Sequence, residues 1–278
     1  MDSQEMLAQR ICADHGYEFV RACNAGASKK TFHVRHAGQD LALKLFTSTP
    51  DHERLSREIT ALSACNHANI SKILDHQSRD IDGTVVNYLV EEYIGGGTLN
   101  ERLTKGRLAR PDTHALALAM SEAIAHLASR NLVHRDIKPD NIMYRDDGAA
   151  VLVDLGVARH LNATTITQPF ILAGPCTPQF AAPEQLLNEK SRIDWRTDQF
   201  GLGVTLSVAT LAMHPYSGDM DLNNGYMRLM AQRPPAIEFI DAANSQGLGI
   251  LIPMVEFWPI KRFVRPADLI VAWQNLGA

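Results

Sequence analysis

Residues 134–141 read HRDIKPDN, and residues 151–156 follow them as VLVDLG, a pattern of strand and then turn. The first segment supplies an acid, a base and an amide within six residues, and the second places another acid after a strand. Phosphoryl transfer needs positioning of the reactants, metal ions that neutralise phosphate charge, and a carboxylate that accepts the proton of the attacking hydroxyl. Hard cations such as Mg2+ prefer oxygen ligands, which Asn141 and Asp154 offer. The two segments therefore predict a phosphoryl-transfer site.

The first part of the chain has the pattern of a sheet with one helix. Short runs rich in Val, Leu and aromatic residues predict strands at residues 31–35, 41–46, 73–76 and 85–92. Between the second and third of these runs, Leu55, Ile59 and Leu62 recur at helical spacing.

The second part of the chain has the pattern of a helical unit. A long helix begins near Pro111, and its apolar face consists of Leu116, Met120, Ile124 and Leu127. We therefore expect two lobes joined near residues 94–97, the first mostly sheet and the second mostly helix. A cleft between lobes is a usual place for a small-molecule site.

The composition excludes several classes of protein. With 45% hydrophobic and 21% charged residues, the chain of 278 residues is expected to be globular rather than disordered. A formal net charge of -4 gives no basic surface for nucleic acid. The start of the chain lacks the pattern of a signal peptide, and the most apolar helical stretch, residues 201–213, is too short to span a membrane. That stretch is expected to be a buried core helix.

The cysteines point to a reducing compartment. Their spacing suits neither a disulfide framework nor a zinc site; they are Cys12, Cys23, Cys65 and Cys176. We therefore expect a cytoplasmic protein without nucleic-acid or membrane partners.

HRDIKPDN followed by DLG resembles the catalytic and metal-binding loops of eukaryotic-type (Hanks-type) serine/threonine protein kinases. The resemblance implies an α+β fold with two lobes: a small β-rich N-lobe at about residues 17–93 and a larger helical C-lobe at about 98–276. A kinase domain would therefore cover residues 17–276. The family's substrates and cofactors would be ATP, Mg2+ and the Ser or Thr hydroxyls of proteins.

The same resemblance implies roles for four residues of these loops. Asp136 would accept the proton, and Lys138 would meet the transferred phosphate. Asn141 and Asp154 would bind the metal. DLG departs from the commoner DFG, but Leu155 keeps an apolar residue at that position.

The motifs of the first lobe match the family less fully. Residues 41–44, LALK, resemble the VAIK strand, so Lys44 would reach the α- and β-phosphates, with Glu58 as its ion-pair partner. The glycine-rich loop would fall on residues 24–31, where only Gly26 of the family's glycines is present. The other positions lose the freedom of positive φ that glycine allows.

Residues 88–94, YLVEEYI, resemble the strand that enters the hinge. In that alignment Glu92 and Ile94 offer backbone groups to adenine, and Glu91 is an acidic gatekeeper. The alternative is that the alignment is out of register there and Glu91 faces solvent.

Residues 176–184, CTPQFAAPE, resemble the family's GTPxYxAPE segment. Thr177 would contact Asp136 and Lys138, and Glu184 would pair with Arg265. Asp198 would hold the catalytic loop from the buried start of a helix.

A regulatory contact is also expected between this region and the catalytic loop. Arg135 is the residue that in this family receives a phosphate from the activation loop, and the available hydroxyls are those of Thr164, Thr165 and Thr167. The alternative is a plain polar loop. Any regulatory module is expected to be a separate protein.

The leading hypothesis is an active serine/threonine protein kinase, and two alternatives stay open. One is a pseudokinase that binds nucleotide or partners without catalysis, which the degenerate glycine loop and Glu91 favour. ATP consumption with a generic basic protein substrate would separate it from an active kinase. The other is a kinase-like enzyme that phosphorylates a small molecule, against which the APE segment and its arginine argue.

Overall fold

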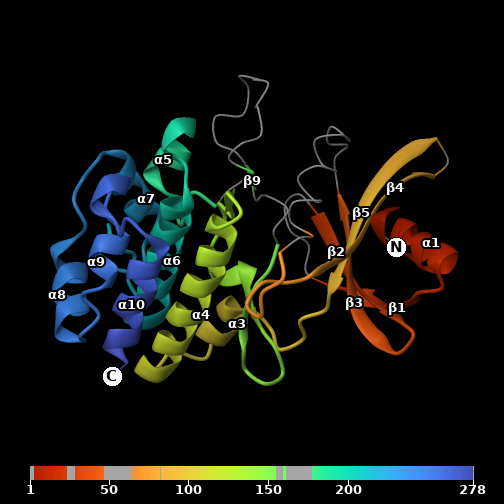
Figure 1. The fold of residues 1–278 in the computed structure, drawn as a ribbon, viewed down its shortest axis with the longest axis horizontal. Helices are drawn as coiled ribbons and strands as arrows, with labels where there is room; N and C mark the ends of the chain where they lie inside the picture. The colour runs from red at the N-terminus through yellow and green to blue at the C-terminus, as the bar shows by residue number, and fades with distance from the viewer. Residues whose placement is uncertain are drawn as a thin grey trace. The chain divides into compact units, whose positions relative to one another are not determined.

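A computed structural model of the chain describes residues 3–23, 29–46, 63, 65–81, 83–154, 159–160 and 177–277. The chain divides into two compact units, the N-terminal unit Met1–Gly95 and the C-terminal unit Gly96–Ala278. Strands dominate the described part of the first unit, and helices dominate the second (Figure 1).

The N-terminal unit is built on a five-stranded antiparallel sheet in the order β1-β2-β3-β5-β4. The strands are β1 (Glu18–Ala22), β2 (Lys29–His36), β3 (Gln39–Phe46), β4 (Ile73–Ile81) and β5 (Thr84–Glu92). Each of the four predicted strands is found, and all four are longer than predicted. The sequence did not predict β1, because this edge strand is largely exposed and its burial does not alternate.

The register of the sheet separates two kinds of side chain onto its two faces. Ala42 pairs with Glu91, and Lys44 pairs with Leu89. Because side chains alternate along a strand, these four lie on one face. The opposite face carries a buried apolar cluster that includes Leu41, Leu43, Leu45, Val86, Tyr88 and Val90.

Helix α1 (Ser3–His15) covers this apolar cluster with Ala8, Ile11 and Cys12. It contacts β1, β2 and β3, and it begins the described part of the chain (Figure 1). The Nε2 atom of His15 lies 2.6 Å from the hydroxyl of Tyr88 and fixes the end of the helix on the sheet. The sequence did not predict this helix, because two of its three buried residues are small and make a weak apolar stripe.

The C-terminal unit has eight helices in its described part. They are α3 (Leu99–Leu103), α4 (Arg110–Ala128), α5 (Pro183–Leu186), α6 (Trp195–Leu211), α7 (Leu222–Met230), α8 (Ile237–Ser245), α9 (Leu251–Met254) and α10 (Pro266–Leu276). Short 3-10 turns lie at η1 (Pro139–Asn141), η3 (Lys190–Arg192) and η4 (Pro259–Lys261). Two small antiparallel pairs complete the unit, β6 (Leu132–Val133) with β9 (Arg159–His160) and β7 (Ile142–Tyr144) with β8 (Ala150–Leu152).

Helices α4 and α6 form the core of this unit. The four residues of the predicted apolar face of α4 are each at most 2% exposed, which confirms that prediction. The apolar stretch near residue 201 is the buried helix α6, as predicted, and Asp194 caps its start by accepting a bond from the backbone N–H of Arg196. A Cβ added at Gly201 would lie 3.2 Å from the carbonyl oxygen of Ile137, so this glycine permits close packing of α6 under the catalytic loop. None of the described helices combines the length and apolar character needed to cross a membrane.

Candidate active site

The segment between β6 and η1 is held in place by a buried aspartate of α6. Asp198 accepts bonds from the backbone N–H groups of His134 (2.8 Å) and Arg135 (2.7 Å), the arrangement expected from the sequence. Arg135 has a φ of 73°, and Gln185 donates to its carbonyl oxygen over 2.7 Å. Burial raises the pKa of Asp198 to about 6, although His134 and the two backbone donors oppose this shift. The backbone of Arg135 is thus hydrogen-bonded through both its N–H and its carbonyl oxygen.

His134 connects this segment to the strand pair β7–β8. The Nδ1 atom of His134 lies 3.3 Å from the backbone N–H of Asp136, and Nε2 lies 3.0 Å from the carbonyl oxygen of Val153. A backbone N–H can only donate and a carbonyl can only accept, so the proton of the neutral ring belongs on Nε2. The buried imidazole therefore connects the loop of Asp136 to the residue that follows β8 through these two hydrogen bonds.

Asp136 accepts bonds from three donors, two in its own loop and one from Thr177. Its Oδ1 atom accepts the backbone N–H of Thr177 at 3.0 Å, and its Oδ2 lies 2.9 Å from both Lys138 Nζ and Asn141 Nδ2. Lys138 Nζ also donates to the hydroxyl of Thr177 over 2.6 Å. The Asp136 side chain is 12% exposed, so it keeps access to solvent. The structure thus brings together the proposed base, the proposed phosphate-binding lysine and the threonine expected beside them.

Asn141 and Asp154 fit a hard metal ion. Asn141 directly precedes β7, and Asp154 lies two residues after the end of β8. Because Ile142 pairs with Leu152, both residues lie at the same end of this strand pair. A bond of 2.9 Å from the N–H of Val153 to the carbonyl oxygen of Asn141 closes that end. Both side-chain bonds of Asn141 are donated by Nδ2, so they leave the amide oxygen that a metal would need. Magnesium sites for phosphoryl transfer often use one or two carboxylates, waters and the phosphates themselves.

A metal site with more protein ligands is absent from the described ranges, where no group of three or more His, Cys, Asp or Glu side chains could hold an ion.

Lys44 and Glu91 form a buried ion pair in the N-terminal unit. The Nζ atom of Lys44 lies 2.9 Å from Oε2 of Glu91, and the two side chains are 9% and 3% exposed. Ser71 Oγ also donates to Oε2, at 3.3 Å. Glu91 therefore does not face solvent. The expected partner of Lys44, Glu58, lies outside the described residues.

The end of β5 presents Glu92 and Ile94, which were expected to offer backbone groups to adenine. The N–H of Glu92 donates to the carbonyl oxygen of Lys72 over 3.0 Å, and the Glu92 side chain accepts the N–H of Lys72 over 2.9 Å. The N–H of Glu92 is therefore already bonded to the residue that precedes β4. The side chain of Ile94 is 5% exposed and belongs to the core.

The predicted ion pair between Glu184 and Arg265 is wrong. Arg262 occupies this position: NH1 and NH2 lie 2.8 Å and 2.9 Å from the two oxygens of Glu184, with both side chains at most 1% exposed. Arg265 instead bonds Asp268 at the surface, where its side chain is 76% exposed. The reason is that Pro266 begins α10, which places Arg265 at the cap of that helix.

Several predicted residues fall outside the described ranges. They are Gly26, Glu58, Leu155, Cys176, Thr164, Thr165 and Thr167. Two residues that contact the site were missed by sequence reasoning, Ser71 and Gln185, and neither belongs to a recognisable motif.

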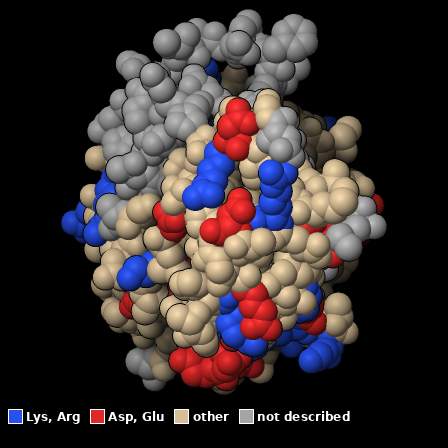
Figure 2. Space-filling view, turned by 90° about the vertical axis from the view of Figure 1, so that its right-hand side faces the viewer, with Lys and Arg blue, Asp and Glu red and all other residues tan. Residues whose placement is uncertain are grey.

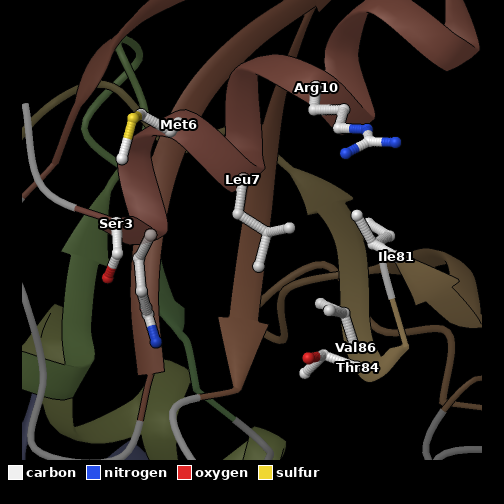
Figure 3. A pocket seen from close by; sticks show the side chains of 8 residues that line it. Ser3, Met6, Leu7, Arg10, Ile81, Thr84 and Val86 are labelled. Carbon is white, nitrogen blue, oxygen red and sulfur yellow. The ribbon is translucent and has the colours of Figure 1, made fainter.

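A separate pocket of about 460 Å3 lies in the N-terminal unit between α1 and the β4–β5 hairpin. Figure 3 shows Met6, Leu7 and Arg10 of the helix above Ile81, Thr84 and Val86. Val86 belongs to the apolar face of the sheet, so this pocket is on the opposite face from Lys44. Figure 2 shows a face on which acidic and basic residues are mixed among other residues.

Comparison with known proteins agrees with the arrangement of the site described above. The family model described as protein kinase domain matches residues 17–263. The serine/threonine-protein kinase PknL of Mycobacterium bovis is 35% identical over 253 residues, which cover 88% of this chain and 59% of that protein. Serine/threonine-protein kinase PrkC of Bacillus subtilis is 27% identical over 265 residues, 91% of this chain and 39% of that protein. A probable serine/threonine-protein kinase PknB of Corynebacterium glutamicum is 28% identical, over 83% of this chain and 36% of that protein. The chain therefore spans between about a third and three fifths of the length of these relatives.

Proposed function

We propose, because the chain belongs to the protein kinase domain family, that it transfers the γ-phosphate of ATP to the Ser or Thr hydroxyls of proteins. The α+β fold with two units, predicted from the sequence, is confirmed. The observation that carries the proposal is the set of donors around Asp136. A backbone N–H, an amide and an ammonium all meet one partly exposed carboxylate.

Each group around Asp136 has a defined task in this proposal. Asp136 accepts the proton of the substrate hydroxyl as the oxygen attacks phosphorus. Lys138 places its ammonium beside that carboxylate, where it can neutralise charge on the transferred phosphate. Thr177 fixes both, because its N–H binds Asp136 and its hydroxyl binds Lys138. Asn141 and Asp154 would hold Mg2+, which would supply positive charge to neutralise the phosphates.

The nucleotide needs residues from the N-terminal unit as well. Lys44 binds the α- and β-phosphates in this proposal, and Gly26 and Glu58 contribute through the loop and the ion pair predicted from the sequence. Glu92 and Ile94 receive the adenine through backbone groups. The buried ammonium of Lys44 supports the first assignment. The attraction between an ammonium and a phosphate is stronger where water is largely excluded.

We also propose that the protein acts in the cytoplasm on protein substrates, without nucleic-acid or membrane partners and with regulation by separate proteins. Cys12 and Cys23 are free thiols, which suits a reducing compartment.

The test is Asp136→Asn with Asp140→Asn as a matched control. Asp140 lies four residues away in the same loop, but it is exposed and bonds only Asn100 among the described hydrogen bonds of its side chain. Loss of a general base lowers turnover by about 10²- to 10⁴-fold. We expect that loss in Asp136→Asn, and near-normal turnover in Asp140→Asn, when transfer from labelled ATP to a generic basic protein is measured.

The product identifies the class of reaction. Phosphoserine or phosphothreonine in the protein substrate supports the proposal. No product from the folded wild type would favour a pseudokinase, and labelled small molecules without phosphoprotein would favour the small-molecule enzyme. Full turnover by folded Asp136→Asn would exclude Asp136 as the base.

A further inference from the structure

Glu91 is placed by the backbone of the sheet to meet Lys44. Strand β3 pairs Ala42 with Glu91 and Lys44 with Leu89, so Lys44 and Glu91 are diagonal neighbours on one face. Diagonal positions on adjacent strands lie about 7–8 Å apart at their α-carbons, within reach of two long side chains. The observed separation of 2.9 Å between Nζ and Oε2 is the contact that this register allows.

The pair is costly if it serves stability alone. Both charges are taken out of water, and replacing a buried ion pair with apolar residues is often neutral or stabilising. In addition, Oε1 of Glu91 is buried and has no hydrogen-bond partner among the residues that the structure describes. A buried acceptor that lacks a hydrogen bond lowers the stability of the fold. Because burying this carboxylate is unfavourable for stability, its presence indicates that its negative charge has a functional role.

We propose that Glu91 is the positioning residue for Lys44, and that its carboxylate holds the ammonium on the nucleotide-facing side of the sheet. The inference rests on the proposed function, in which Lys44 binds the phosphates of ATP. An ammonium has three donors, so the bond to Glu91 leaves it able to donate to phosphate as well. Glu91 acts through Lys44 and touches neither the metal nor the transferred group.

The backbone explains why Glu91 suits this task. Strands β3 and β5 pair continuously from Leu41 to Leu45, and the strand ladder therefore fixes the distance between the two side chains. Ser71 supports the same carboxylate oxygen from the segment before β4. Lys44 is thus aligned by the sheet that carries it, and Glu58 is expected to matter less than Glu91.

The experiment compares Glu91→Gln with Asn87→Ala in the full chain. Asn87 is a matched control, because it is buried on the same strand and the same face, but no hydrogen bond joins it to Lys44 within the described part of the chain. Hydrogen bonds to charged groups contribute about 1.5–3 kcal/mol, which corresponds to a change of roughly 10- to 100-fold. We expect Glu91→Gln to weaken binding of Mg-ADP by that factor in calorimetry and to lower kcat/KM for ATP similarly. The KM for the protein substrate should not change, Asn87→Ala should match the wild type, and Glu58→Gln should show the smaller loss.

A second pair of variants covers the case in which Glu91→Gln does not fold. Lys44→Met leaves Glu91 as an unpaired buried charge, and Lys44→Met/Glu91→Gln removes that charge. Both should bind Mg-ADP equally weakly, because Glu91 has no ammonium left to position. A further loss in the double variant would overturn the proposal, as would a folded Glu91→Gln protein with wild-type ADP affinity and kinetics. If the wild type itself neither binds ADP nor transfers phosphate, the proposed function fails before the role of Glu91 is in question.

Discussion

Replacing Arg262 with Met should destabilise the C-terminal unit severely, whereas replacing Arg265 with Met should not. The guanidinium of Arg262 is buried and donates to both oxygens of Glu184. It also donates to the carbonyl oxygens of Arg196, Glu256 and Phe257. The methionine fills a similar volume but offers no donor to any of these oxygens.

The magnitude follows from what the substitution leaves behind. Among the described residues, Glu184 would keep only the hydroxyl of Thr197 as a hydrogen-bond donor, and its charge would stay buried. Removing one partner of a buried ion pair costs about 3–5 kcal/mol. For a unit of this size, that cost lowers the melting temperature by roughly 6–20 °C. Arg265 makes an exposed pair with Asp268, and such pairs contribute about 1 kcal/mol or less.

Tryptophan fluorescence during urea unfolding measures this loss in the unit concerned. The chain has three tryptophans, Trp195, Trp258 and Trp273, and all belong to the C-terminal unit. The double variant Glu184→Leu/Arg262→Met should recover part of the loss, because it removes the stranded charge. Equal and small losses in Arg262→Met and Arg265→Met would refute the reasoning.

Two further predictions concern the packing of α1 and the titration of Asp198. Ile11→Ala should lower the free energy of unfolding of the N-terminal unit by about 2–5 kcal/mol, because Ile11 is 1% exposed. Met6→Ala should lower it by at most about 0.5 kcal/mol, because Met6 is 53% exposed. Hydrogen exchange of the backbone amides of β3 and β5 measures both losses. The raised pKa of Asp198 means that the folded protein binds a proton between about pH 4 and 6 that the unfolded chain releases, so this group's contribution to stability falls as pH rises through that window. The unfolding free energy of the wild type relative to Asp198→Asn should therefore decrease from pH 4 to pH 6, by at most about 3 kcal/mol, and an unchanged difference would contradict the assignment.

The parts of the molecule that the sequence predicts best are those set by local spacing. Asp136, Lys138 and Asn141 lie within one short loop, so their mutual contacts need little more than the turn at η1. The apolar face of α4 was equally predictable, because helical periodicity alone determines which residues lie on the same side of the helix. The positions of β2, β3, β4 and β5 followed from composition, although their lengths were underestimated and the exposed strand β1 was missed.

The parts that the sequence does not predict depend on the register of distant segments. Lys44 and Glu91 are 47 residues apart, and their contact follows from the pairing of β3 with β5. Arg262 directly follows η4 and Arg265 directly precedes α10, and only the direction in which each side chain points decides which is buried. Helix α1 shows a third limit, because Ala8 and Cys12 pack tightly without making a strong apolar pattern.

The catalytic loop combines local strain with buried support. Arg135 and Asp154 are not glycines, yet their φ angles are 73° and 66°. Such residues cost of order 1–3 kcal/mol each and persist only where the surroundings determine the backbone. At Arg135 those surroundings are Asp198 on the N–H and Gln185 on the carbonyl oxygen. Because the strained peptide directly precedes Asp136, the buried supports beneath it are what turn the carboxylate toward Thr177 and Lys138.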